Sequence, residues 1–283
     1  MKEFKKILFN SLKNIYSKSE IQIFNNLILE KVTGLNRAKL LANNDIDLDE
    51  NQEKLALEYL ERLKNLEPIH YILGETEFYG LKLKVDPSVL IPRPETEELV
   101  EWVLFDINML DNQAVRVLDI GTGSGAIAIA IKSKNPKIEV SGMDISTEAL
   151  KNAEENVKLN NVDVDFIEDN ILTPKSYNQK WDVIVSNPPY IPIDEKSIID
   201  KQVVDFEPHV ALFSPSEKPL LFFHKIAAFA ISHLAPQGNI YFETHKDHAR
   251  NVAKMLGNYG FTDVVIRNDI SGHERMVRGS FMN

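Results

Sequence analysis

The stretch VRVLDIGTGSGAIAIAIKSK, residues 115–134, decides the fold that this sequence predicts. It begins with an apolar run typical of a buried strand, passes through a glycine-rich turn, and ends in an apolar pattern typical of a helix. The alternation continues outward with the strand IEVSGMD, the helix TEALKNAEENVKLN and the strands VDFIE and WDVIVS. Alternating β and α segments favour a mostly parallel, doubly wound α/β sheet, which binds its ligands beyond the carboxyl ends of the strands.

The rest of the chain divides into three predicted segments. Residues 1–67 carry apolar side chains at helical spacing, which indicates a small helical docking domain. Residues 68–95 alternate apolar and polar side chains between turn residues, which is typical of a hairpin-like linker. Residues 96–283 then form the α/β domain. No apolar run approaches the roughly 20 residues that span a bilayer, so we expect a cytoplasmic protein without membrane contact.

Composition limits the partners and the chemistry. The chain has a net charge of -10 and shows no basic cluster, whereas proteins that bind duplex DNA normally concentrate positive charge. We therefore expect no stable binding of nucleic acid. The sequence contains no cysteine, which excludes disulfides, thiolate metal sites and cysteine nucleophiles. The seven histidines are scattered, and no metal site is predicted.

The glycine-rich turn predicts a nucleotide-containing cofactor. Glycines let the backbone approach a ligand closely and expose the free N–H groups at the start of the next helix. The candidate cofactor-binding residues of the turn are Gly121, Thr122, Gly123, Ser124 and Gly125. Asp144 ends the next strand, where a carboxylate can bind ribose hydroxyls or, alternatively, cap the following helix. This pattern alone does not distinguish NAD from S-adenosylmethionine, and the alternative to both is a tight turn without a ligand.

Asp169 and Asn170 follow the third strand of the predicted sheet. A carboxylate or amide there can accept a hydrogen bond from the exocyclic amine of adenine. The alternative is an ordinary Asx turn, in which the side chain bonds its own backbone.

The motif Asn187-Pro188-Pro189-Tyr190 follows the fourth strand and favours S-adenosylmethionine as the cofactor. A planar amide or aromatic amine is a poor nucleophile, and a site helps by accepting hydrogen bonds from its N–H groups and aligning the nitrogen with the methyl group. The Asn187 side chain and the Pro188 carbonyl supply two acceptors, and Tyr190 can stack on the flat substrate. The alternative is a proline turn with Tyr190 in the core.

Together these residues resemble the protein-(glutamine-N5) methyltransferases of the PrmC/HemK type. The resemblance rests on PIHYILGETEFYG, VLIPRPETEELV, VLDIGTGSGAIAIA, VSNPPYIP, FEPHVAL and DISGHERMVRG. It implies a Rossmann-like class I S-adenosylmethionine methyltransferase domain, with a mostly parallel seven-stranded sheet and a small N-terminal helical domain. It also implies an enzyme of translation termination, a monomer without a metal. This enzyme methylates the glutamine of the GGQ motif in peptide chain release factors and leaves S-adenosyl-L-homocysteine.

The resemblance also assigns roles to residues. It implies cofactor binding by the glycine turn, Asp144, Asn170 and Asn187, and glutamine binding by Asn187, Pro188, Pro189 and Tyr190. Arg93 and Glu95 would shape the pocket mouth, although a salt-bridged linker is equally consistent with their positions. The chain departs from the family pattern in the loop 214–219, where relatives have a glycine-rich turn, and at Asn170, where an aromatic can occur.

Two other functions are consistent with parts of this pattern. An N6-adenine methyltransferase acting on nucleic acid needs the same amine chemistry, but also base extrusion and a positively charged channel. A non-enzymatic binding module could retain the fold, but the intact glycine turn and Asn187 argue against it.

Overall fold

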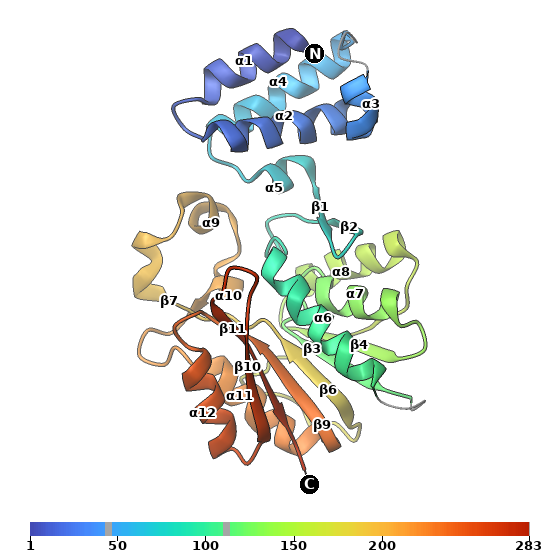
Figure 1. Cartoon of the computed structure of the whole chain (residues 1–283), viewed down its shortest axis with the longest axis vertical. Coiled ribbons are helices and arrows are strands. Elements are labelled where there is room, and N and C mark those ends of the chain that lie inside the picture. Colours follow the sequence, from blue (N-terminus) through green and yellow to red (C-terminus); the bar gives the residue numbers. More distant parts are fainter. Residues whose placement is uncertain (43–46, 110–113, 283) are drawn as a thin grey trace. The chain divides into compact units, whose positions relative to one another are not determined.

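The computed structural model of the chain describes residues 1–42, 47–109 and 114–282 (Figure 1). The chain forms two compact units. The first consists of Met1–Glu75 together with Asp200–Phe206, and the second of Thr76–Ile199 together with Glu207–Asn283. Each unit has a hydrophobic core of its own.

The first unit is helical. Its elements are α1 (Lys2–Leu12), α2 (Lys18–Thr33), α3 (Arg37–Ala42), α4 (Glu50–Lys64), α5 (Ile69–Leu73) and α9 (Lys201–Phe206). Helix α2 begins at a capping box, because the Ser17 hydroxyl accepts from the Glu20 N–H while the Glu20 carboxylate accepts from the Ser17 N–H. It ends at Gly34, whose φ of +69° lies in the left-handed region that glycine adopts without strain.

Helix α9 comes from far along the chain but belongs to this unit. The Gln202 side chain donates a hydrogen bond of 2.6 Å to the Tyr16 hydroxyl, which in turn donates one of 2.9 Å to the Leu63 carbonyl. The segment 68–95, which the sequence presents as a hairpin-like linker, starts with helix α5 and continues as the hairpin of β1 (Glu75–Phe78) and β2 (Leu81–Lys84).

The second unit is built on a seven-stranded sheet in the order β10-β11-β9-β6-β3-β4-β5. All neighbouring pairs are parallel except those made by β11, which confirms the predicted mostly parallel α/β sheet. The chain runs outward through β3, β4 and β5 and returns to β6 on the other side of β3, so the strand order reverses between β3 and β6. The strands are β3 (Arg116–Ile120), β4 (Glu139–Asp144), β5 (Asp165–Glu168), β6 (Trp181–Ser186), β9 (Leu234–Glu243), β10 (Thr262–Asn268) and β11 (Glu274–Ser280).

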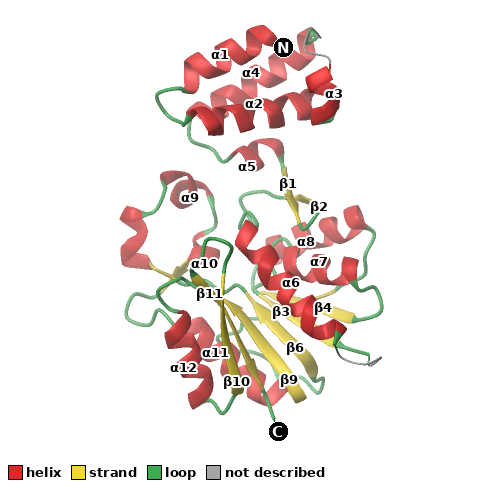
Figure 2. Ribbon diagram, viewed as in Figure 1, coloured by secondary structure: helices red, strands yellow, loops and turns green. Residues whose placement is uncertain are grey.

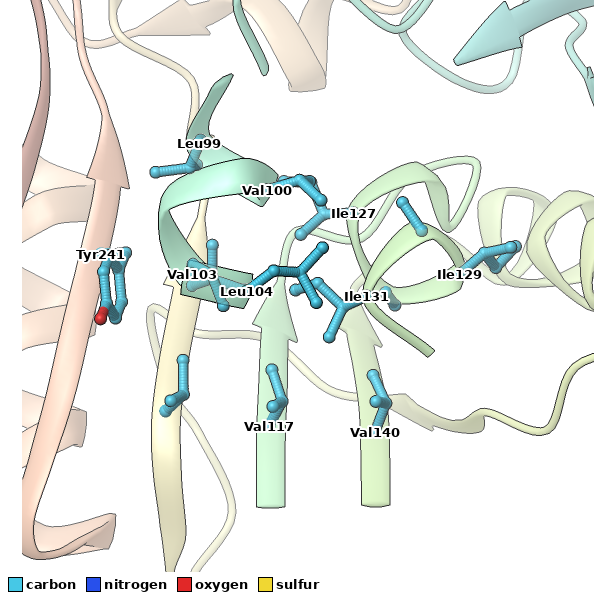
Figure 3. Close-up of a cluster of buried hydrophobic side chains, with 14 of the residues drawn as sticks. Leu99, Val100, Val103, Leu104, Val117, Ile127, Ile129, Ile131, Val140 and Tyr241 are labelled. Atoms are coloured by element: carbon cyan, nitrogen blue, oxygen red, sulfur yellow. The ribbon is translucent and has the colours of Figure 1, made fainter. Parts of the chain in front are cut away.

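Helices cover both faces of this sheet (Figure 2). Val117 packs with α6 and α7 on one face, and its neighbour Leu118 packs with α11 and α12 on the other, as alternating strand residues must. Figure 3 shows the first of these cores, in which Leu99, Val103 and Ile127 lie over Val117 and Val140. The helices are α6 (Pro94–Asn108), α7 (Ala126–Lys134), α8 (Thr147–Asn160), α10 (His209–Leu212), α11 (Leu221–His233) and α12 (Ala249–Asn258).

The chain between β6 and α11 adds small elements near the ends of the strands. These are the 3₁₀ helix η1 (Ile193–Ile198) and the two-stranded parallel pair of β7 (Ile191–Pro192) and β8 (Phe213–Ser214). Within the described parts of the chain, no helix combines the length and the apolar character that crossing a membrane requires.

Candidate active site

A cavity lies in the second unit at the carboxyl ends of the parallel strands. It encloses about 940 Å³ of space, part of which is open solvent at its mouth. The turns that follow β3, β4, β5 and β6 all contribute to its wall, and the reversal of strand order lies beside it, as expected for open α/β sheets. The residues that line the cavity include Ser88, Val89, Leu90, Gly121, Gly123, Asp144, Asp169, Asn170, Asn187, Pro188 and Pro189.

The glycine turn after β3 forms one side of the cavity. Gly121 and Gly123 line it, and both have positive φ, at +74° and +54°. Gly125 caps α7 at φ +80°, where an added Cβ would lie 2.9 Å from the Ile129 side chain. A side chain at these positions would strain the backbone or fill space beside the helix start. Thr122 and Ser124 are buried in the turn and are not among the lining residues.

Asp119, at the base of the glycine turn, was not a candidate from the sequence. It is fully buried, and burial raises the pKa of its carboxyl to about 7. One oxygen, Oδ2, accepts a hydrogen bond of 2.6 Å from the Thr122 hydroxyl, while Oδ1 has no hydrogen-bond partner among the described residues. The carboxylate therefore holds the turn from beneath.

Asp144 connects the end of β4 with the glycine turn. Its carboxylate accepts hydrogen bonds of 2.9 Å from the Gly123 N–H and from the Ser146 N–H, and it lines the cavity. Partial burial raises its pKa. Helix α8 is capped by the Ser146 hydroxyl, which accepts from the Ala149 N–H, so Asp144 does not serve as the helix cap.

Asp169 and Asn170 line the cavity from the turn after β5. The Asp169 carboxylate accepts from the Tyr177 hydroxyl at 2.5 Å and from the Lys175 and Asn170 N–H groups. Burial alone would raise the pKa of this carboxyl, but these donors outweigh it and hold the pKa below its ordinary value. The Asn170 side chain accepts a hydrogen bond of 2.9 Å from the Leu172 N–H, which is an Asx turn. Asn170 therefore forms this turn and also lines the cavity.

The motif after β6 also contributes to the cavity wall. Asn187, Pro188 and Pro189 line the cavity, whereas Tyr190 packs against the core on the α11 side of the sheet, with its ring centre 6.1 Å from that of His245. Burial raises the pKa of the Tyr190 hydroxyl, and the nearby Glu243 carboxylate adds to this. The structure therefore brings three of the four predicted motif residues to the cavity and leaves Tyr190 behind them.

Two residues behind Asn187 were also missed by sequence reasoning. The Asn187 amide donates to the Thr96 hydroxyl at 3.3 Å, and the Thr96 hydroxyl donates to the Glu243 carboxylate at 2.6 Å. Glu243 is the last residue of β9, which pairs with β6, so the carboxyl ends of these two strands meet. A glutamate that closes an apolar strand of a parallel sheet is the signal that could have identified it.

Arg93, in the segment before α6, forms an ion pair with a buried carboxylate. Its guanidinium donates a hydrogen bond of 2.5 Å to the carboxylate of Glu207, whose side chain is only 2% exposed. The second Glu207 oxygen accepts from the Ile91 N–H at 3.3 Å. Arg93 is not among the lining residues, whereas Ser88, Val89 and Leu90 of the same segment are. The ion pair is the contact that the alternative of a salt-bridged linker expects, and a role at the pocket mouth stays a prediction.

Comparison with known proteins identifies the relatives of this chain. The chain matches the methyltransferase small domain family over residues 104–204 and the PrmC N-terminal domain family over residues 10–74. It is 41% identical to the release factor glutamine methyltransferase of Flavobacterium psychrophilum over 99% of each chain. It is 36% identical to the enzyme of the same name from Bacteroides thetaiotaomicron, over 94% of this chain and 95% of that one. The solved structure of a methyltransferase from Pyrococcus furiosus matches 82% of this chain and 99% of its own, with a TM-score of 0.51 and 16% identity.

Proposed function

The chain belongs to the family of release factor glutamine methyltransferases, and we infer from this that it methylates the side-chain amide nitrogen, N5, of the GGQ glutamine in peptide chain release factors. The observation that carries the inference is one cavity lined both by the glycine turn and by Asn187-Pro188-Pro189. A cofactor and a planar amide can therefore bind side by side. The family does not favour the alternative of adenine methylation.

The cavity fits the cofactor that the methyltransferase fold implies, S-adenosylmethionine, which supplies an electrophilic methyl group on sulfur when bound. We propose that Gly121–Gly125 provide backbone N–H groups and a close approach at the start of α7. Asp144 would accept hydrogen bonds from the ribose hydroxyls, since its carboxylate already lies between the glycine turn and β4. Asp169 and Asn170 would border the adenine.

Asn187 and Pro188 would act on the substrate nitrogen rather than on a proton. The lone pair of an amide nitrogen is delocalised, so the rate depends on holding that nitrogen in one orientation toward the methyl group. We propose that the Asn187 side-chain oxygen and the Pro188 carbonyl accept hydrogen bonds from the two N–H groups of the glutamine amide. The methylated nitrogen is strongly acidic, so its proton leaves afterwards and no general base is required.

Asp144→Ala is expected to weaken S-adenosylmethionine binding by roughly 1.5–3 kcal/mol, because the ribose hydroxyls lose a charged acceptor. Calorimetry on the purified protein measures the dissociation constant. Asp144→Asn, which keeps one acceptor oxygen for Gly123 or Ser146, should lose less. A dissociation constant unchanged in Asp144→Ala would remove this residue from the cofactor site.

We propose that the helical unit, Met1–Glu75 with Asp200–Phe206, docks the release factor while the α/β unit does the chemistry. A free glutamine amide carries too little information for selective methylation, so recognition has to come from outside the cavity. The glycines of the GGQ motif would let a protein loop enter a narrow site without side-chain clashes. We further propose a cytoplasmic monomer that uses no metal and binds no nucleic acid stably, in keeping with its net charge of -10.

Incubation with labelled S-adenosylmethionine and separate panels of release factor, short GGQ peptide and DNA tests the proposed function. We expect one added methyl group on the GGQ glutamine of the intact release factor, much weaker labelling of the peptide and none of DNA. Mass spectrometry of a proteolytic digest locates the methyl group. Label on adenine, or an unmodified glutamine in the presence of bound cofactor, would overturn the assignment.

A further inference from the structure

A buried hydrogen-bonded chain stands behind the Asn187 side chain, outside the cavity itself. Glu243 is 1% exposed and Thr96 is 5% exposed. The Thr96 hydroxyl donates to the Glu243 Oε2 at 2.6 Å and accepts from the Asn187 Nδ2 at 3.3 Å. Burying a carboxylate costs free energy, so the position of Glu243 beside the candidate active site suggests a role beyond packing.

Counting donors shows what this chain does to Asn187. A threonine hydroxyl has one hydrogen, and Thr96 gives it to the Glu243 carboxylate, so Thr96 presents only a lone pair to Asn187. An ionised Glu243 likewise offers only acceptors. The Asn187 side chain must therefore turn its NH₂ group toward Thr96 and Glu243, and its oxygen is the amide atom left for the cavity that Asn187 lines.

We propose that Glu243 is a positioning residue that fixes the Asn187 amide through Thr96, with the amide oxygen presented to the substrate glutamine. The inference rests on the proposed role of Asn187 as an acceptor. Without the carboxylate the amide can rotate by half a turn. The NH₂ group of Asn187 would then face the NH₂ group of the substrate, and two donors cannot hydrogen-bond each other.

The charge of Glu243 makes this orientation depend on pH. Burial raises the pKa of the Glu243 carboxyl to about 7, against the opposing effects of the Thr96 hydrogen bond and of Arg275. Glu95 also acts on this carboxyl, and Tyr190, Arg93 and His245 lie in the surrounding cluster.

Below its pKa the carboxyl acquires a hydrogen that it can donate to Thr96. The Thr96 hydroxyl can then donate to the Asn187 oxygen, which would favour the rotated amide. Because the ionised form maintains the productive orientation, turnover should rise with pH through about 7.

The test compares Glu243→Gln, Thr96→Val and Thr96→Ser with the wild type in single-turnover methylation of the intact release factor between pH 5.5 and 9. Glu243→Gln should lower the rate constant on the order of 100-fold at high pH and abolish the rise through neutral pH. Thr96→Val should reduce the rate and Thr96→Ser should restore it. The cofactor affinity and the melting temperature of each variant, measured without substrate, should stay near the wild-type values. The one expected exception is Glu243→Gln above neutral pH, whose melting temperature should rise because the buried charge is gone.

Asp106→Asn is the control, because Asp106 is also a carboxylate that accepts a hydroxyl hydrogen bond between α6 and β9, in this case from Tyr241 at 2.6 Å, and it also forms an ion pair with Arg278. It and His245→Asn should keep the rise through neutral pH. The proposal is overturned if Glu243→Gln keeps the wild-type rate and pH profile while Asn187→Ala is inactive. An active Asn187→Ala variant would instead overturn the proposed role of Asn187. If Glu243→Gln and Thr96→Val both lower the melting temperature and abolish cofactor binding, Glu243 has only a structural role. That result would also overturn the proposal.

Discussion

Replacement of Asn187 by alanine is expected to lower the single-turnover rate of methyl transfer by about a thousandfold or more, since orientation of the reacting nitrogen is worth several kcal/mol of barrier. The dissociation constant for S-adenosylmethionine should change only a few-fold, because the glycine turn and Asp144, which also line the cavity, are the proposed cofactor contacts and stay intact. Rapid mixing of the enzyme–cofactor complex with release factor separates this chemical step from binding.

A suitable control for Asn187→Ala is Asn160→Ala. Asn160 is a surface residue of α8 whose amide donates to the Lys82 carbonyl, away from the lining residues. This variant should methylate at the wild-type rate. An Asn187→Ala rate within tenfold of wild type would rule out the acceptor role and leave the Pro188 carbonyl as the surviving candidate.

Arg93→Ala is expected to destabilise the protein by about 3 kcal/mol, because it leaves the Glu207 carboxylate buried without its ionic partner. Denaturant unfolding followed by circular dichroism measures this loss. Adding Glu207→Gln to Arg93→Ala should recover part of the stability, since the uncompensated charge is then gone.

The same variant separates the two interpretations of Arg93. If Arg93 is a linker residue, Arg93→Ala should lower the stability and leave the Michaelis constant for release factor little changed in the folded protein. A residue at the pocket mouth predicts the reverse, namely unchanged stability with weaker binding of the release factor. Unchanged stability in Arg93→Ala would therefore contradict the role that the ion pair with Glu207 indicates.

The sequence predicted those features that depend on neighbours along the chain. Residues 115–134 predicted a strand, a glycine turn and a helix, and β3, the turn and α7 occupy these positions. The alternation of apolar segments predicted the parallel sheet. It also brought the turns after β3 and β6 to one edge, because parallel strands end together.

Features that depend on distant pairings were not predictable in this way. Thr96 and Glu243 are 147 positions apart, and they meet only because β9 is inserted beside β6. Likewise, Glu207 is separated from Arg93 by 114 positions. Tyr190 illustrates the remaining ambiguity, since an aromatic after a proline turn suits a substrate stack and a core equally well until its neighbours are known.

The membership of α9 in the helical unit has a consequence for how such an enzyme can be rearranged by evolution or by engineering. The polypeptide passes from one unit to the other three times, after Glu75, Ile199 and Phe206. Cutting the chain after Glu75 would consequently remove Tyr16, the hydrogen-bond partner of Gln202. It would also leave helix α9 without its unit, in the loop that follows Asn187-Pro188-Pro189-Tyr190. An exchange of the helical unit between relatives would therefore have to transfer two separate pieces of sequence together.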